Sequence, residues 1–256
     1  MSTINAPVTL PSIRPVALPV PPLPVLPLSV PPHPIPPLQS GDRLNHEQYM
    51  ERYKLMPPKV KAERIEGVVY IMMAPISHDF HGRPHIKMAS WLGSYMAATL
   101  GVDAGDNGTI ALDVDNNPQP DLYLFVQPAC GGRVKIENGY VVGSPELIVE
   151  IAASSASYDL GVKQHVFRRN GVQEYVVMRT YDGEIDWFIL RNGDYHRQSP
   201  DAEGILRSEV FPGLWLNALA MLEGKLAAVL AVLQTGMLSA GHAEFIAKLA
   251  AASPKV

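Results

Sequence analysis

Residues 146–153 restrict the fold of this chain more than any other segment. The run is apolar apart from Glu146 and Glu150, and a run of this length and composition is typical of a strand buried inside a sheet. Alternation places Glu150 on the same face as Ile148 and Ala152. An unpaired carboxylate buried there costs on the order of several kcal/mol, so Glu150 needs a cation, a metal ion or several hydrogen-bond donors.

Prolines are concentrated in the first forty residues, which hold 13 of the 24 in the chain and one charged residue, Arg14. Proline has no amide donor and fixes φ, so we expect residues 1–40 to form an extended, disordered tail that is dispensable for folding and able to dock an unknown protein. The segment is too interrupted by proline to span a membrane. It also lacks the basic start and apolar core of a secretory signal, so we expect a cytoplasmic protein without membrane association.

The remaining segment of about 215 residues is long enough for one domain with a sizeable core. The single cysteine, Cys130, excludes an intramolecular disulfide and fits a reducing compartment. A net charge of −4 weighs against a nucleic-acid partner, because phosphate binding favours a basic surface. Four basic residues can still form a local patch that this total conceals: Arg133, Lys135, Arg168 and Arg169.

Periodicity and turn residues predict an α+β chain with a mixed sheet flanked by helices. Helices are expected at residues 42–53, 84–99, 157–170, 216–234 and 242–251. Strands are expected at residues 109–114, 121–126, 146–153, 174–179, 185–190 and 195–198, with hairpins at 63–73 and 133–142. In the second hairpin, Asn138-Gly139 favours a type I′ turn.

Two acids and a lysine give the clearest chemical signal. Asp121 follows Pro120, Glu150 lies in the apolar run, and Lys163 comes thirteen positions later, beside Phe167 on the expected inward face of a helix. Carboxylates hold Mg²⁺, and an ammonium group can orient a nucleophile during phosphodiester hydrolysis. The structural alternatives are a Glu150–Lys163 ion pair, a surface Lys163–Asp159 pair, and a strand-edge role for Asp121.

Other reactive residues carry weaker signals. His78, His81 and His85 have spacings that could suit zinc, but Pro84 interrupts any single helix through them and no H-E-x-x-H motif is present. We expect His81 to reach the active-site cleft instead. Ser154 and Ser155 lack the frame of a nucleophile elbow and are expected to help cap the next helix, while Cys130 has no identifiable base.

The chain resembles the bacterial restriction endonucleases of Uma-two type, a branch of the PD-(D/E)XK superfamily, over residues 42–219. The motifs are Glu63-Arg-Ile-Glu-Gly67, Ala74-Pro75 with a nearby histidine, Gln119-Pro-Asp121, Pro145-Glu-Leu-Ile-Val-Glu-Ile151, Ser154-Ser155, Asp159, Lys163, Gly171-Val-Gln-Glu-Tyr-Val176 and Phe211-Pro-Gly-Leu214. Three departures are Ala152 at the commonest lysine position, Phe167 for the usual tyrosine, and Ser154-Ser-Ala for the usual Ser-Pro-Ser.

The resemblance implies a restriction-endonuclease-like domain at residues 41–219, followed by a helical extension at 220–256. It assigns Asp121 and Glu150 to metal binding, Lys163 to the displaced catalytic lysine and Glu63 to an additional acid. The implied activity is Mg²⁺-dependent DNA endonuclease, with Mn²⁺ as an alternative ion and a homodimer as one assembly. The alternative is a catalytically idle nuclease fold that binds nucleic acid or protein, with the acid–lysine cluster as a structural ion pair.

Overall fold

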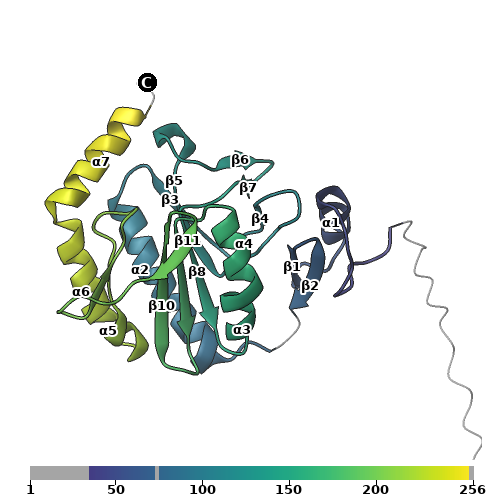
Figure 1. Ribbon diagram of the computed structural model, residues 1–256, viewed down its shortest axis with the longest axis horizontal. Coiled ribbons are helices and arrows are strands. Elements are labelled where there is room, and N and C mark those ends of the chain that lie inside the picture. The colour runs from purple at the N-terminus through teal and green to yellow at the C-terminus, as the bar shows by residue number, and fades with distance from the viewer. Residues whose placement is uncertain (1–34, 73–74, 254–256) are drawn as a thin grey trace, which may run out of the picture. The chain divides into compact units, whose positions relative to one another are not determined.

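The computed structural model describes residues 35–72 and 75–253, in which a six-stranded mixed sheet has the order β11-β10-β9-β8-β5-β3 (Figure 1). Its strands are β3 (Val102–Asp106), β5 (Leu122–Val126), β8 (Leu147–Ala152), β9 (Glu174–Arg179), β10 (Glu184–Arg191) and β11 (Asp194–Arg197). Strands β8 and β9 are parallel, and the other neighbouring pairs are antiparallel. The expected α+β class with a mixed sheet flanked by helices is confirmed.

Strand β8 lies inside the sheet, between β5 and β9, and all its residues are buried. The apolar run therefore forms the expected interior strand. Antiparallel pairing with β5 places Leu122 opposite Val149, and parallel pairing with β9 places Glu150 opposite Val177. The edge strand β3 was not predicted, because its sequence Val-Asp-Ala-Gly-Asp is weakly apolar and contains a glycine.

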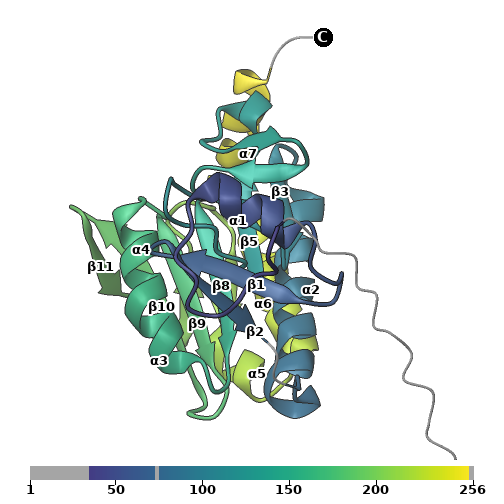
Figure 2. The same ribbon diagram turned by 90° about the vertical axis from the view of Figure 1, so that its right-hand side faces the viewer.

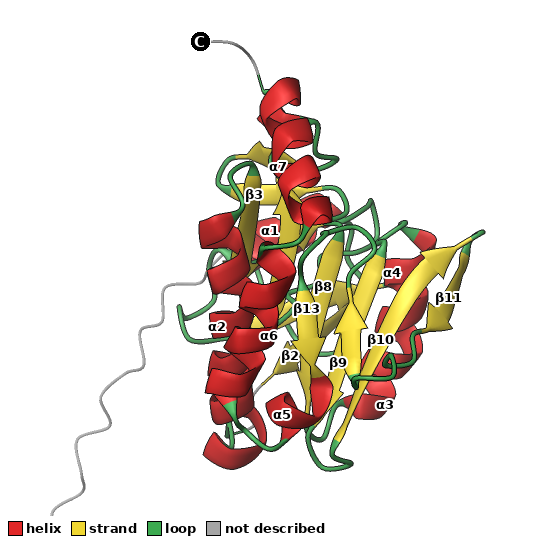
Figure 3. Ribbon diagram, turned by 90° about the vertical axis from the view of Figure 1, so that its left-hand side faces the viewer, coloured by secondary structure: helices red, strands yellow, loops and turns green. Residues whose placement is uncertain are grey.

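One face of the sheet is covered by helices α2 (Arg83–Ala98), α5 (Ala218–Leu222), α6 (Leu226–Met237) and α7 (Ala240–Ala252) (Figure 3). Trp91 and Trp187 meet edge to face in this core, with ring centroids 5.9 Å apart. The single helix expected at 216–234 is wrong. Residues Trp215–Asn217 form strand β13, which pairs with β12 (Ile205–Arg207), and α5 and α6 are separated at Gly224, whose φ is +75°.

The other face is covered by α3 (Ala156–Tyr158), the π-helical turn η3 (Asp159–Lys163) and α4 (Gln164–Arg169) (Figure 2). The expected continuous helix over 157–170 is interrupted at Gly161, whose φ of −104° and ψ of −106° are not helical. A three-stranded sheet of β4 (Ile110–Ala111), β7 (Tyr140–Val142) and β6 (Lys135–Glu137) lies beside the same core. The predicted hairpin turn is confirmed, with positive φ at Asn138 and Gly139.

A third, smaller core joins helix α1 (His46–Tyr53) to the hairpin of β1 (Lys61–Ile65) and β2 (Val68–Met72). Leu38 was expected in the tail but is buried in this core beside Tyr49, Ala62 and Val69. The folded part therefore begins before residue 41. Residues 1–34 of the predicted tail lie outside the described residues, as does Ala74.

The π-helical turn η1 (His78–Gly82) leads into α2, and the short 3-10 turn η2 (Pro128–Cys130) follows β5. Among the described residues, no single helix is long and apolar enough to cross a membrane. Helices α6 and α7 meet the length and composition criteria only as a pair, and they are bent by 66° at the break between them.

Candidate active site

Asp121 and Glu150 lie opposite each other on neighbouring strands. Because Leu122 pairs with Val149 in an antiparallel ladder, the next position outward brings Asp121 opposite Glu150, on the same face of the sheet. The backbone N–H of Ile151 donates to Asp121 Oδ2 at 2.8 Å, and Asp121 N lies 3.4 Å from Glu150 Oε2. Both residues are buried, so the sheet itself holds the two carboxylates side by side.

Lys163 reaches these acids from the turn η3. Its Nζ lies 2.5 Å from Glu150 Oε1, 3.1 Å from Glu63 Oε1 and 3.6 Å from Asp159 Oδ1. The ammonium group also lies 5.7 Å from the ring centroid of Tyr158 and 5.9 Å from that of Phe167. The expected inward position of Lys163 beside Phe167 is confirmed. The contact with Asp159, for which a surface pair was the structural alternative, is buried.

Glu63 closes the cluster from strand β1. The backbone N–H of Gln119 donates to Glu63 Oε1 at 2.7 Å, and the Tyr158 hydroxyl lies 3.4 Å from Oε2. Glu63 is only 1% exposed. The structure thus brings together all four residues predicted for the site, Glu63, Asp121, Glu150 and Lys163, while their roles stay predictions.

Lys61 and His81 form the more exposed side of this cluster. Lys61 Nζ lies 3.4 Å from Asp121 Oδ1 and His81 Nε2 lies 3.6 Å from the same oxygen. Their side chains are 30% and 25% exposed, against 7% for Asp121. His81 therefore reaches the carboxylate cluster, the place predicted for the active site. Lys61 was missed, although it precedes Glu63 by two residues and strand alternation places both on one face.

His85 also contacts this region. Its Nε2 lies 3.3 Å from the backbone oxygen of Asp121 and 3.1 Å from Asp106 Oδ1, while its ring stacks on that of His81 at 5.7 Å. His81 Nδ1 lies 3.1 Å from the backbone oxygen of Ile151. The two histidines thus contact the backbone of both acid-bearing strands. In residues 35–72 and 75–253, no group of three or more His, Cys, Asp or Glu side chains is arranged to hold a metal ion.

The cluster has more negative than positive charge. Among the described residues, the carboxyl groups of Glu63, Asp121, Glu150 and Asp159 face two lysine ammonium groups, those of Lys61 and Lys163. Glu150 Oε1 is buried and, within the described residues, receives no hydrogen bond of good geometry despite the nearby lysine. An additional cation would therefore relieve an electrostatic deficit.

The environment separates the pKa values of the two opposed acids. Burial raises the pKa of Glu150 well above its usual range; Lys163 opposes this shift, and the neighbouring carboxylates add to it. Burial also favours the neutral form of Asp121, but Lys61, His81, the Ile151 N–H and Lys163 together outweigh it and lower the pKa of Asp121. Burial alone would lower the pKa of Lys163, yet Glu150, Glu63 and Asp159 raise it, so the lysine is charged.

The site is compatible with a hard divalent cation. Mg²⁺ needs few protein ligands, because it retains several waters and is usually bound through one or two carboxylates. Asp121 and Glu150 supply oxygen ligands from adjacent strands, and the excess negative charge fits a cation. In the described residues, no three His, Cys, Asp or Glu side chains are placed to hold one ion, which argues against the closed ligand set typical of structural zinc.

The remaining reactive residues lie in structural settings. Ser155 precedes α3, but its side chain does not cap that helix. Burial raises the pKa of Asp159, and the hydrogen bond from the Ser155 side chain partly opposes that rise. Capping of α3 by Ser155 is therefore wrong. Cys130 is half-buried in η2, where it packs against the core on the α2 side of the sheet.

The chain belongs to the Uma2 family, described as "Putative restriction endonuclease", whose model matches residues 46–220. This match confirms the resemblance that the motifs indicated. Among solved structures, the chain is similar to a "putative nuclease belonging to DUF820" from Anabaena variabilis, with 15% sequence identity and a TM-score of 0.49 over 68% of this chain and 98% of that one. No match was found among curated proteins.

Proposed function

We propose that this protein is a Mg²⁺-dependent DNA endonuclease that hydrolyses phosphodiester bonds through Asp121, Glu150 and Lys163. The observation that carries the proposal is the placement of Asp121 opposite Glu150, with Lys163 Nζ 2.5 Å from Glu150 Oε1. Asp121 and Glu150 would hold the ion, and Mn²⁺ should replace Mg²⁺ because it accepts the same oxygen ligands. Membership of a family described as restriction endonucleases supports DNA as the substrate.

The residues around the ion would act by charge and position. When bound, the metal would lower the pKa of a water molecule and screen the phosphate. The Lys163 ammonium would donate a hydrogen bond to the attacking oxygen or to the phosphate, as a compact charge held in place by Glu63. Lys61, at the more exposed side, would contact a phosphate as the DNA approaches.

Plasmid cleavage tests the proposal directly. Purified protein is incubated with supercoiled plasmid in Mg²⁺, in Mn²⁺ and in EDTA, beside the Asp121→Asn variant. We expect nicked and linear products with either ion and none with EDTA or with the variant. Cleavage that persists undiminished in Asp121→Asn would contradict the proposed site.

The second candidate is an idle nuclease fold that binds nucleic acid or protein. It is favoured by the contacts of Lys163, because its ammonium group is already surrounded by three buried carboxylates, as in a structural ion pair. This candidate predicts no cleavage with either ion and no calorimetric Mg²⁺ binding that depends on Asp121. Mg²⁺ binding abolished by Asp121→Asn would exclude it as an account of the cluster.

The proposal includes three points on the setting of this activity. The protein would act in the cytoplasm, the location expected from its sequence. A homodimer would allow two cuts in one duplex, and size-exclusion chromatography with light scattering tests that assembly. The proline-rich N-terminal segment would dock a partner with an aromatic-lined groove.

A further inference from the structure

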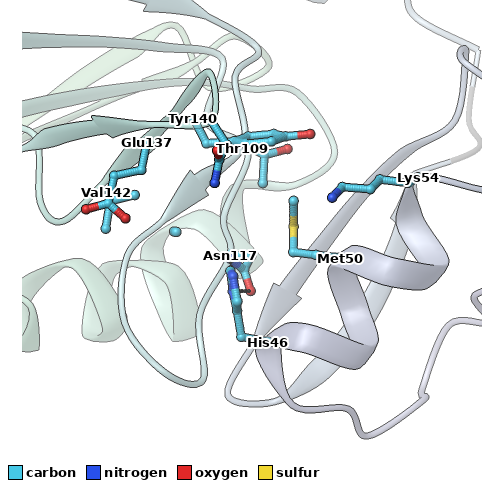
Figure 4. Close-up of a pocket in the computed structure, with 10 residues that line it drawn as sticks. His46, Met50, Lys54, Thr109, Asn117, Glu137, Tyr140 and Val142 are labelled. Carbon is cyan, nitrogen blue, oxygen red and sulfur yellow. Dashed lines mark hydrogen bonds between the residues drawn. The ribbon is translucent and has the colours of Figure 1, made fainter.

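A second concave site lies between α1 and the β4-β7-β6 sheet, outside the carboxylate cluster (Figure 4). The pocket has a volume of about 160 Å³. A pocket for a drug-sized ligand usually measures about 300–1,000 Å³, so this one suits a single small ring system. The lining residues used below are His46, Met50, Lys54, Thr109, Asn117 and Tyr140.

Some polar side chains that line this pocket hydrogen-bond to other residues of the protein, and others do not. Asn117 is completely buried; Arg64 Nε donates to its Oδ1 at 3.0 Å, and its Nδ2 lies 3.0 Å from His46 Nδ1. Thr109 is only 8% exposed, but its hydroxyl is not one of the buried polar atoms without a partner among the described residues, so it is open to solvent on the pocket wall. A hydroxyl in this position can exchange water for the polar edge of a ligand.

The charge and shape of the lining side chains restrict the chemical class of the ligand further. Lys54 follows α1, and its ammonium group has no carboxylate within ion-pairing distance in the described part of the chain. Figure 4 shows Lys54 approaching Met50 from the side opposite Thr109 and Tyr140. A thioether and an aromatic ring suit the face of a planar heterocycle. The Lys54 ammonium group suits an anion attached to that heterocycle, provided the anion lies on the Lys54 side of the pocket and away from the lining acid Glu137.

The pocket is close enough to the carboxylate cluster to contact the same nucleic acid. Asn117 lines the pocket and Asp121 belongs to the cluster, and four residues of extended chain span at most about 14 Å. That length corresponds to about four base steps of 3.4 Å in a DNA strand. A strand cut at Asp121 would therefore pass within reach of the pocket.

We propose that this pocket binds one nucleotide, with its base against Met50 and Tyr140, its polar edge at Thr109 and its phosphate at Lys54. The inference rests on the proposed nuclease function for the source of that nucleotide, a base unstacked from the DNA substrate. A free nucleotide offers the same chemistry, so the test includes it as a separate ligand. The pocket would give the enzyme a preference for particular bases near the cut.

Binding is measured without cleavage, in full-length protein carrying Asp121→Asn and in EDTA. Fluorescence anisotropy of labelled oligonucleotides is recorded at several salt concentrations, and the four deoxynucleoside monophosphates are titrated calorimetrically. The pocket variants are Thr109→Val, which replaces the hydroxyl by a methyl group, and Lys54→Met. The control is Lys59→Met, an exposed lysine that does not line the pocket.

We expect Thr109→Val to weaken binding about 2- to 12-fold, the loss of one hydrogen bond. Lys54→Met should reduce the slope of log K against log salt by about 0.7 to 0.9, the loss of one phosphate contact, whereas Lys59→Met should leave it unchanged. Losses that appear with the monophosphates but not with the oligonucleotides would assign the pocket to free nucleotides. Oligonucleotide binding that is unchanged in Thr109→Val and Lys54→Met, with both variants folded by circular dichroism, would overturn the inference.

Cleavage and binding measurements distinguish a failure of the nuclease proposal from a failure of the pocket proposal. Plasmid cleavage by wild-type protein with unchanged oligonucleotide binding in both pocket variants would refute the pocket and leave the nuclease. Nucleotide binding that depends on Thr109 and Lys54, in a protein that never cleaves, would support the pocket and refute the nuclease.

Discussion

Lys163 is the residue on which the electrostatics of the carboxylate cluster depend. Its ammonium group is the common neighbour of Glu63, Glu150 and Asp159, and all four side chains are at most 5% exposed. A catalytic lysine and a structural lysine would both sit in this arrangement. Stability alone therefore does not separate the two functions, and the measurements must include metal binding or cleavage.

Replacing Lys163 by methionine should be strongly destabilising in metal-free protein. The variant leaves three buried carboxylates without their shared cation, and breaking one side of a buried pair costs about 3–5 kcal/mol. Urea denaturation in EDTA measures the loss, with Lys225→Met as an exposed control expected to change stability by less than about 0.5 kcal/mol. Mg²⁺ should restore part of the loss if it binds this site. A variant as stable as wild type would show that the cluster is not charged as described.

Asp121→Asn and Glu150→Gln should each abolish metal-dependent cleavage while the protein stays folded. Amides keep the shape of the side chain but remove the negative charge that holds Mg²⁺. Plasmid nicking and calorimetric Mg²⁺ titration test both variants beside Asp194→Asn, a surface acid paired with Arg168. Retained activity in either site variant would refute its role.

At the scale of elements, one buried acid ties strand β9 to the segment before β13. Glu174 accepts hydrogen bonds from the Ser208 hydroxyl at 2.8 Å and from the backbone N–H groups of Glu209 at 2.6 Å and Val210 at 3.1 Å. Burial raises the pKa of Glu174 to about 7, against its ordinary 4.5, and the hydrogen bonds oppose that shift. The connection is therefore sensitive to pH.

The raised pKa of Glu174 should make stability fall as pH rises from about 4.5 to about 7. Below 4.5 the group is protonated in both states, and above 7 the folded state must ionise a buried acid that the unfolded state ionises freely. The shift corresponds to about 3 kcal/mol. Glu174→Gln should lack this loss, so its unfolding free energy relative to wild type should increase between pH 4.5 and pH 8 in urea titrations. If the difference in unfolding free energy between Glu174→Gln and wild type did not change with pH, the prediction would be wrong.

For the molecule as a whole, the start of the folded part decides what can be truncated. Leu38 is 3% exposed in the small core of α1 and the β1–β2 hairpin. Gly41 N donates to Val69 O at 2.8 Å, and Ser40 Oγ accepts from Ile71 N at 3.0 Å. Residues 40 and 41 therefore run along β2.

Deleting residues 1–34 should leave the unfolding free energy unchanged, whereas deleting residues 1–40 should lower it by about 2–5 kcal/mol. The second deletion removes a buried leucine, and Leu→Ala changes in cores cost about that much. Leu38→Ala in the full chain is the matched variant and should reproduce most of the loss. Equal stability of the two truncations in urea denaturation would show that Leu38 contributes nothing.

The sequence alone predicted which face of their elements Glu150 and Lys163 occupy. Alternation placed Glu150 with Ile148 and Ala152, and the helical period placed Lys163 inward beside Phe167, because both patterns depend only on local geometry. The motif resemblance added Glu63 to the same site. The predicted positions of Glu150 and Lys163 are confirmed, because a buried charge in an apolar run restricts its own surroundings; the roles of all three residues stay predictions.

Tertiary structure decided which faces meet. Glu63 and Lys163 are 100 residues apart in the chain, and only the packing of the β1–β2 hairpin against η3 joins them. The same long-range packing brings Lys61 to Asp121 and forms the pocket between Lys54 and Thr109. Local periodicity carries no information about partners at such separations, because their contacts depend on how all the elements fill one core.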